Sequence, residues 1–212
     1  LDRYAPEAHL KEFSEAWVKQ KGMPTVTTQW DDGKLIITQS DPFKRGLTWQ
    51  QSFLVDAIYI NKVENDGAEQ TRITTTTIPV DMQGVKKEIA LAKRPDYIVP
   101  NADGSGYGLF VFDNFDNIPL PTDDLRRFAL AMNMYENYLA HGIDAKSLSD
   151  TMHSWLKAEN NALIASQLVS YWGGAVSAMP DTDRHFQEQQ MWQEYRNATI
   201  ASVKQRLIRQ LY

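Results

Sequence analysis

Residues 25–39 read TVTTQWDDGKLIITQ, and this stretch decides the fold class of the first half of the chain. β-Branched and aromatic side chains fill both ends, and Asp32-Gly33 between them favours the tight turn of a β-hairpin. Outward from this hairpin, further strands are predicted at residues 49–60, 71–78, 85–91, 96–99 and 109–112. About seven short strands at regular spacing are typical of a β-sandwich. We therefore predict a β-sandwich domain over residues 23–118.

Helical spacing occurs on both sides of the predicted strands. Leu10, Phe13 and Trp17 predict a short N-terminal helix within residues 1–22. After the strands, apolar residues recur at steps of three and four, which predicts an all-α domain over residues 119–212. Short loops between its helices indicate antiparallel neighbours, so we expect a helical-hairpin domain.

Four helices are predicted in this second domain. The first is capped by Thr122 and closes at His141-Gly142, and the second begins near Asp144. The third ends at Gly173-Gly174, and the fourth runs from Pro180 to the last residue. The apolar stripe of the first helix consists of Leu125, Phe128, Met132, Tyr135 and Leu139. Stacked hairpins need neighbours that cover their apolar faces, so we expect the pattern to continue beyond the final residue.

The amino-acid composition excludes several classes of protein. Of the 212 residues, 42% are hydrophobic and 23% are charged, which excludes a disordered or collagen-like chain. No apolar run approaches about 18 residues, so we expect no membrane span. Lysine and arginine number 22 against 27 acidic residues, which argues against nucleic acid as a partner because phosphate binding needs clustered basic side chains. The lack of cysteine excludes disulfides and thiolate metal sites.

The chain begins Leu1-Asp2-Arg3, with neither methionine nor the pattern of a signal peptide. We interpret it as a fragment of a longer protein. We expect this fragment to be soluble, and its sequence does not indicate a cellular compartment.

The histidines do not form a zinc motif. His9, His141, His153 and His185 are at least 12 positions apart, whereas zinc hydrolases commonly place two ligands within one helical turn. We interpret them as ordinary surface or helix-end residues.

The segment 101–112 has the best candidate for another metal. Asn101-x-Asp103-x-Ser105-Gly106 matches the first positions of a calcium-binding loop, but its twelfth position, which requires an acidic residue, is Phe112. A glycine-rich hairpin loop is the better interpretation. The glycines at 104, 106 and 108 precede a strand and not a helix, so they form no dinucleotide loop, and Ser105 lacks the context of a nucleophile. We assign no catalytic residue, metal ligand or cofactor to this chain, and no ligand-binding residue is identified.

Six tryptophans and an aromatic content of 11% suggest a carbohydrate- or peptide-binding role, which competes with a place in the core. Trp155, Trp172 and Trp192 lie on apolar helical stripes and are predicted to belong to the core, whereas Trp30 and Trp49 fit either a buried or an exposed position. Asn197-Ala198-Thr199 is a glycosylation sequon, which we attribute to chance because it falls in a predicted helix.

Two segments of the chain carry a resemblance to a known family. The first joins Trp17 and residues 22–26, GMPTV, to the strand at 35–40, LIITQS, which is followed by Trp49. The second is residues 100–113, PNADGSGYGLFVFD. In their order and spacing these segments resemble the zinc aminopeptidases typified by aminopeptidase N, in which the second segment reads Asn-x-x-x-x-Gly-Tyr-Tyr-Arg-Val-x-Tyr-Asp.

The chain departs from this family pattern at two neighbouring positions. Gly108 replaces the usual second aromatic residue and Leu109 replaces the usual arginine. The resemblance implies that residues 1–22 end an upstream catalytic domain, that 23–118 form the β-sandwich after it, and that 119–212 begin the helical domain. The family's zinc ligands, acid–base glutamate and exopeptidase motif lie upstream, so no catalytic residue transfers to this chain.

For the whole protein, the resemblance implies that a zinc-activated water removes N-terminal residues from peptides. The zinc would belong to the upstream catalytic domain, which is the implied partner of this chain, and the chain alone should be inactive. Its helical domain would cover the peptide-binding cavity. The alternative hypothesis is a stand-alone glycan- or peptide-binding module with Trp30 or Trp49 in an exposed patch.

Overall fold

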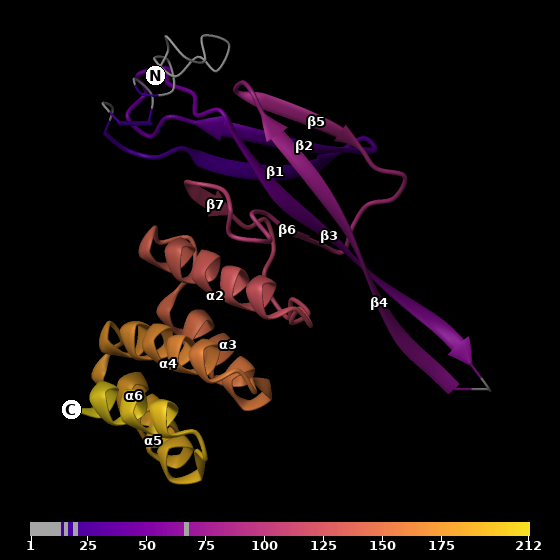
Figure 1. Cartoon of the computed structure of the whole chain (residues 1–212). Coiled ribbons are helices and arrows are strands. Elements are labelled where there is room, and N and C mark those ends of the chain that lie inside the picture. Colours follow the sequence, from indigo (N-terminus) through magenta and orange to yellow (C-terminus); the bar gives the residue numbers. More distant parts are fainter. Residues whose placement is uncertain (1–13, 15–16, 19–20, 66–67) are drawn as a thin grey trace, which may run out of the picture. The chain divides into compact units, whose positions relative to one another are not determined.

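A computed structural model describes residues 14, 17–18, 21–65 and 68–212 of the chain (Figure 1). It contains two compact units, of which the first ends at Ile118 and the second is Pro119–Tyr212. The described part of the first unit holds two β-sheets, and the second unit holds five helices. The N-terminal helix predicted within residues 1–22 lies almost wholly outside the described residues.

The larger sheet has the strand order β5-β2-β1-β7. Its strands are β1 (Thr25–Asp31), β2 (Lys34–Ser40), β5 (Lys86–Ala90) and β7 (Leu109–Val111). β1 and β2 pair antiparallel in the register Trp30↔Leu35, and the turn residues Asp32 and Gly33 have φ angles of 41° and 77°. Two successive positive φ angles are the requirement of a type I′ turn, which an Asp-Gly pair meets. The predicted hairpin is therefore confirmed.

The first and last strands of the sheet unit lie side by side. β1 and β7 are parallel, with Thr25 opposite Leu109 and Val26 opposite Phe110. The backbone N–H of Leu109 donates a hydrogen bond to the Pro24 carbonyl at 2.9 Å. Two segments more than 80 positions apart in the sequence thus form one strand pair.

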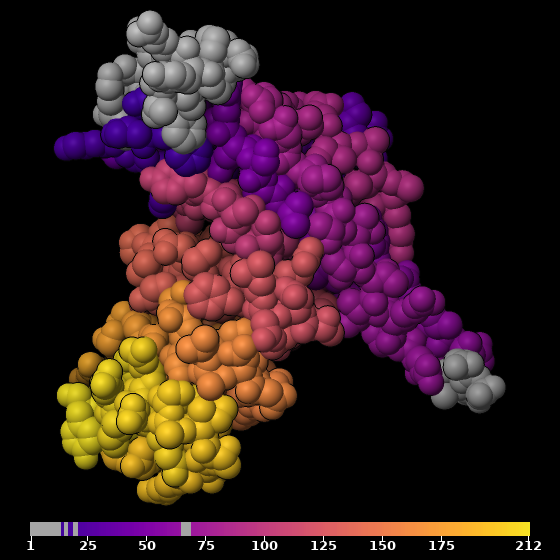
Figure 2. Space-filling model, in the orientation of Figure 1, coloured from indigo at the N-terminus to yellow at the C-terminus, as the bar shows by residue number. Residues whose placement is uncertain are grey.

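The smaller sheet is dominated by one long hairpin. Its order is β4-β3-β6, with β3 (Gln51–Asn65), β4 (Ala68–Met82) and β6 (Tyr97–Val99). β3 and β4 each span 15 residues, several more than predicted, and β6 pairs only with residues 56–58 of β3. The far half of the hairpin is thus a two-stranded ribbon, which projects from the rest of the sheet unit as a narrow arm (Figure 2).

One hydrophobic core joins the two sheets. Its buried members are Val26, Leu35, Ile37, Phe53, Val55, Ala57, Ile78, Val80, Met82, Ile98 and Phe110. The Phe53 ring of the smaller sheet meets the Phe110 ring of the larger sheet edge to face, with centroids 4.9 Å apart. Each large side chain in this core contributes about 2 kcal/mol by leaving water.

A buried amide fixes the chain between β2 and β3. Gln39 Oε1 accepts a hydrogen bond from the Trp49 N–H at 2.9 Å, and Gln39 Nε2 donates to the carbonyls of Trp49 and Gly84 at 3.1 and 2.8 Å. Every polar atom of this buried side chain therefore has a partner, which removes the cost of placing it in the interior.

The carboxylate of Glu88 ties β5 to its neighbour β2. It lies 2.5 Å from Lys86 Nζ and 2.9 Å from Lys34 Nζ. Hydrogen bonds and charge from Lys86 and Lys34 lower the pKa of Glu88 from its ordinary 4.5 to about 2. Because folding favours the ionised form, the stability from these pairs is complete above the ordinary pKa and is lost as the pH falls towards 2.

We expect a carboxyl NMR titration to give a midpoint near pH 2 for Glu88. The midpoint should rise in Lys34→Gln, because one of the two cations is removed. Lys62→Gln is the matched control, since Lys62 pairs with Glu69 and not with Glu88. A Glu88 midpoint that is the same in Lys34→Gln and in the unchanged chain would contradict this account.

The helical unit contains α2 (Asp124–Leu139), α3 (Ala145–Ala158), α4 (Ala162–Ser177), α5 (Asp181–Asn197) and α6 (Ala201–Leu211). None of the described helices is both long enough and apolar enough to cross a membrane. The predicted fourth helix is wrong in length. The backbone is extended at Ala198 and Ile200, so the helix ends there and α6 returns to pack against α4 and α5, where it buries Val203 and Leu207.

The predicted ends of the other helices also need correction. Asp123, and not Thr122, caps α2, because its side chain accepts a hydrogen bond from the Arg126 N–H. Beyond α2, His141 and not Gly142 takes the left-handed conformation, with φ 63°. Gly173-Gly174 does not end α4 but lies inside it.

The two glycines of α4 serve close packing. A Cβ atom on Gly174 would lie 2.8 Å from the Tyr135 hydroxyl of α2, so only glycine allows this approach of the two helices. The predicted apolar stripe of α2 is wrong. Leu125, Phe128 and Leu139 are exposed, and Met132 and Tyr135 are only half-buried. The buried apolar side chains are instead Ala129, Leu130, Ala131 and Met134. The contacts of α2 with α3 and α4 determine which of its sides is buried, and the spacing of its apolar residues alone does not.

A buried ion pair joins α2 to the loop between α3 and α4. Arg127 donates to both carboxylate oxygens of Glu159, from Nε at 2.7 Å and from Nη2 at 3.1 Å. The Glu159 side chain is 1% exposed. Burial alone would raise the pKa of Glu159, but the hydrogen bonds from Arg127 and from the Asn161 N–H together hold it below its usual value.

Candidate functional site

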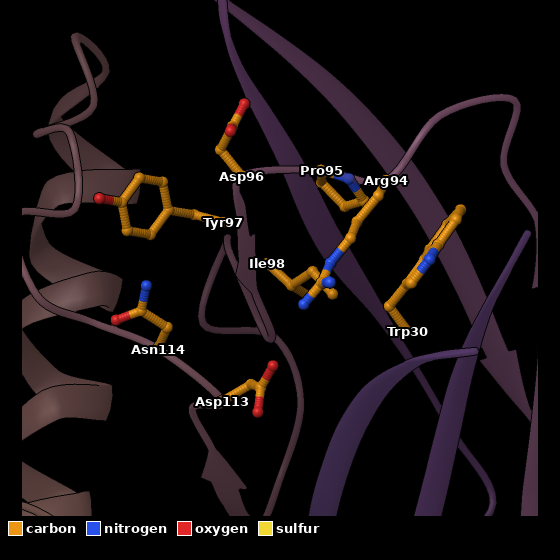
Figure 3. Close-up of a pocket in the computed structure, with 8 residues that line it drawn as sticks. All are labelled: Trp30, Arg94, Pro95, Asp96, Tyr97, Ile98, Asp113 and Asn114. Carbon is orange, nitrogen blue, oxygen red and sulfur yellow. The ribbon is translucent and has the colours of Figure 1, made fainter. Parts of the chain in front are cut away.

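A pocket of about 300 Å³ opens in the sheet unit and is the best candidate for a ligand site in the described part of the chain (Figure 3). We call it the Trp30 pocket. Its lining residues are Trp30, Arg94, Pro95, Asp96, Tyr97, Ile98, Asp113 and Asn114. They come from three separate segments: the end of β1, the chain leading into β6, and the residues after β7.

The topology explains why these segments meet. β7 continues the larger sheet beside β1, and their parallel register carries the chain after β7 towards the end of β1 at Trp30. β6 is the edge strand of the smaller sheet. The pocket thus lies where the edges of the two sheets adjoin without pairing.

Two hydrogen bonds hold the walls of the pocket. The Tyr97 hydroxyl donates to the Asp116 carbonyl at 2.9 Å, which fixes the segment after β7 against β6. Asp96 Oδ2 accepts the backbone N–H of Ile60 at 2.7 Å, which fixes the start of β6 against β3. The lining is therefore supported from both sheets.

Other polar groups of the pocket are left unused. Within the described ranges, Arg94 and Asp113 have neither an ion-pair nor a hydrogen-bond partner, although both line the same pocket. The Trp30 Nε1–H and the Asn114 amide N–H groups also have no acceptor among the described residues. Figure 3 shows the Arg94 side chain extending alongside the Trp30 ring, with its guanidinium towards Ile98 and Asp113. The pocket thus presents several donors, one carboxylate without a partner among the described residues, and the aromatic rings of Trp30 and Tyr97.

The tryptophans separate into buried and accessible residues. Trp49 is 1% exposed, so it cannot belong to an exposed binding patch, and that part of the alternative hypothesis is wrong. Trp155 and Trp172 are buried, as predicted. Trp192 is half-buried and packs edge to face on Tyr195. Trp30 is half-buried and lines a pocket, so of the two candidates only Trp30 has an accessible side chain.

The histidines are not brought together. His141 and His185 are exposed, and His9 lies outside the described residues. His153 stacks on the Trp172 ring at 4.4 Å and lies 2.9 Å from a Glu194 carboxylate oxygen, which is a contact between α3, α4 and α5. In the described part of the chain, no three acidic or histidine side chains are close enough to hold a metal ion.

The loop at 101–106 is closed by its own side chains. Asn101 has φ 52°, and its Oδ1 accepts the Gly106 N–H at 2.7 Å while its Nδ2 donates to the Gly106 carbonyl at 3.2 Å. Asp103 Oδ1 accepts from the Ser105 hydroxyl at 2.9 Å. Asn101 Oδ1 and Asp103 Oδ1, which the calcium pattern would offer, are thus engaged within the loop. The hairpin-loop interpretation is wrong, because the loop joins β6 of the smaller sheet to β7 of the larger sheet and these two strands do not pair.

The sequence did not single out Arg94, Asp113 or Asn114. Each is an ordinary polar residue in a loop. The pairing of β1 with β7 carries Asp113 and Asn114 towards Trp30, whereas Arg94 lies in the chain that leads into β6. Trp30 was a candidate because, like Trp49, it lies on no predicted helical stripe and fits either a buried or an exposed position, but no local pattern indicates its neighbours.

The sequence was compared with models of protein families and with curated proteins. The sequence matches no protein-family model. No curated protein is found to be similar to it.

Proposed function

We propose that this chain is the non-catalytic C-terminal segment of a zinc-dependent aminopeptidase-like protein, in which it positions the helical unit over the peptide-binding cavity. The finer fold belongs to the same proposal. Residues 23–118 are a β-sandwich, supported by the shared core of the two sheets, and residues 119–212 begin a helical-hairpin domain. Residues 1–22 end the upstream catalytic domain.

The observation that carries the proposal is that the segments of the resemblance contact one another. Residues 22–26 lead into β1 and residues 100–113 contain β7, and these two strands pair through the bond from Leu109 to Pro24. Gln39, in the 35–40 strand of the first segment, holds the backbone of Trp49. The residues that suggest the family thus build one structural unit, which is what a shared fold requires.

One departure from the family pattern has a local cause. Gly108 has φ 140°, and a Cβ atom there would lie 2.5 Å from the Pro24 carbonyl oxygen. In this chain the position accepts no aromatic side chain with the backbone as it stands. The departure therefore follows from how tightly β7 joins β1.

The proposal predicts that the purified 212-residue chain binds no zinc stoichiometrically and hydrolyses no aminoacyl p-nitroanilide. The physical reason is that its described residues hold no cluster of metal ligands, and a zinc-activated water needs at least three protein ligands. Metal analysis after dialysis and a colorimetric assay measure both quantities. Metal-dependent turnover that co-purifies with this chain would contradict the proposal.

A second test addresses the parent protein. The coding sequence upstream of Leu1 is expected to encode His-Glu-x-x-His followed by a further glutamate. An upstream sequence without this motif would remove the catalytic part of the proposal and leave a binding function for the chain itself.

A further inference from the structure

The unused groups of the Trp30 pocket point to a ligand of their own. We propose that the pocket binds one ring of a neutral saccharide, with Trp30 against the ring face and with Arg94, Asp113 and Asn114 on its hydroxyl groups. This site does not depend on the aminopeptidase-like function, because its residues belong to the sheet unit alone.

The hydrogen-bonding groups match hydroxyls better than any single charged group. A hydroxyl both donates and accepts, so neighbouring hydroxyls can accept from a guanidinium or amide and donate to a carboxylate. The pocket supplies both kinds of partner in Arg94, Asn114 and Asp113. Bonds that involve an ionised group are the stronger kind, so the unpaired guanidinium and carboxylate gain most from such a ligand.

The charge of the lining disfavours ions. Arg94 contributes one positive charge, and Asp96 and Asp113 contribute two negative charges, so the formal sum is −1. An anion would be repelled by the carboxylates, and a cation would meet Arg94 in the same small volume. A neutral polyhydroxylated ligand satisfies both signs without adding a third charge.

The aromatic surface supplies the apolar contact. A sugar ring has one face of C–H groups, and the negative face of an aromatic ring attracts such groups through weak contacts and burial. Trp30 is half-buried and lies on the side of the pocket opposite Tyr97 and Asn114 in Figure 3. A ring with one face against Trp30 would therefore have its other face towards Tyr97 and Asn114.

The volume of the pocket limits the number of sugar rings that the ligand can place in it. A volume of about 300 Å³ is at the lower end of small-molecule sites, which run from roughly 300 to 1,000 Å³. It suits one terminal sugar ring and is too small for several. We therefore expect a dissociation constant of about 1 mM for a single methyl glycoside.

The test is titration of the whole 212-residue chain with four methyl glycosides, those of glucose, galactose, mannose and N-acetylglucosamine. Isothermal calorimetry measures affinity, and saturation-transfer NMR reports which protons of the glycoside touch the protein. At least one glycoside should bind saturably, and its affinity should not change with added sodium chloride because the ligand is neutral. Trp30→Ala should weaken it about tenfold, equivalent to roughly 1.4 kcal/mol.

Matched controls separate binding from folding. Asp113→Ala and Asn114→Ala change exposed loop residues and should reduce affinity without lowering the unfolding temperature. Phe43→Ala and Arg72→Gln alter an exposed aromatic residue and an exposed arginine of the same unit that do not line the pocket, and they should bind like the unchanged chain.

Several outcomes would overturn the proposal. One is the absence of saturable binding by all four glycosides. Another is equal binding by the unchanged chain, Trp30→Ala and Asp113→Ala. Salt-dependent binding of trialanine that Arg94→Gln abolishes, with no glycoside binding, would assign the pocket to a peptide terminus instead.

Discussion

Replacement of Arg127 by alanine should lower the free energy of unfolding of the helical unit by about 3 kcal/mol. The guanidinium makes two bonds to Glu159, whose side chain is 1% exposed. Arg127 also donates to the Thr122 carbonyl at 2.6 Å at the start of α2. Alanine would leave a buried carboxylate without its cation, and the loss of one partner from a buried pair is the costly case. Calorimetry and the helical circular dichroism signal measure the change.

Two further variants make this prediction specific. Arg209→Ala removes an exposed arginine of α6 and should change stability by no more than about 0.5 kcal/mol. Arg127→Ala combined with Glu159→Gln should recover part of the loss, because glutamine keeps an acceptor for the Asn161 N–H but carries no charge. Equal stabilities of Arg127→Ala and Arg209→Ala would mean that the ion pair does not support the unit.

The stability that the Arg127–Glu159 ion pair contributes should depend on pH. Arg127 helps to hold the pKa of Glu159 below its usual value, so in the unchanged chain this stability is present above that value and is lost as the pH falls. In Arg127→Ala the pKa of Glu159 should rise, because the effect of burial is then opposed only by backbone hydrogen bonds such as that from the Asn161 N–H. The difference in stability between the two proteins should therefore shrink in acid.

Gly108→Ala should destabilise the sheet unit by about 3 kcal/mol. The residue has φ 140°, and an added Cβ would lie 2.5 Å from the backbone oxygen of Pro24, an atom that cannot move without disturbing the pairing of β1 and β7. For a unit of this size such a loss lowers the unfolding temperature by more than about 10 °C. Thermal unfolding followed by calorimetry tests it.

Gly84→Ala is the control for that variant. Gly84 is also outside the strands of the sheet unit, but nothing lies within 4 Å of its added Cβ and its φ is not positive. It should unfold within about 0.5 kcal/mol of the unchanged chain. If Gly108→Ala were as stable as Gly84→Ala, the tight junction of β7 with β1 would not exist in solution.

Local chemistry was sufficient to predict the elements of the sheet unit. The hairpin at 25–39 was recognisable because Asp-Gly, here Asp32-Gly33, is one of the few residue pairs that favour a two-residue turn between strands. The partners of each strand were not recognisable. Nothing near Leu109 indicates that its neighbour is Thr25, because strand pairing depends on the packing of the whole core.

The helical unit illustrates the same limit at helix ends. Gly173-Gly174 has the composition of a terminus, yet it lies inside α4 because Tyr135 of another helix needs the space. Glycine is used both for left-handed caps and for close approach, and only the tertiary contact distinguishes the two uses. The break before α6 was missed for a related reason, since it follows from where Val203 and Leu207 can be buried.

The candidate site was the least predictable part. Trp30 could be proposed because it lies outside the predicted helical stripes, but Arg94 and Asp113 are distant in sequence and carry no motif. Arg94 and Asp113 become candidates only because both line one pocket and neither has a partner among the described residues. No sequence motif marks such a pocket, whereas charged side chains without partners in the structure do.

The parallel pairing of β1 with β7 also has a mechanical consequence. Tension applied to the chain before Thr25 and after Val111 would pull these strands lengthwise past each other. Their hydrogen bonds would then be loaded in shear and would have to break together, and not one after another as in an unzipping hairpin. Stretched between its two ends, the sheet unit should resist extension until β7 is torn from β1, and the β3–β4 arm would carry no load before that point.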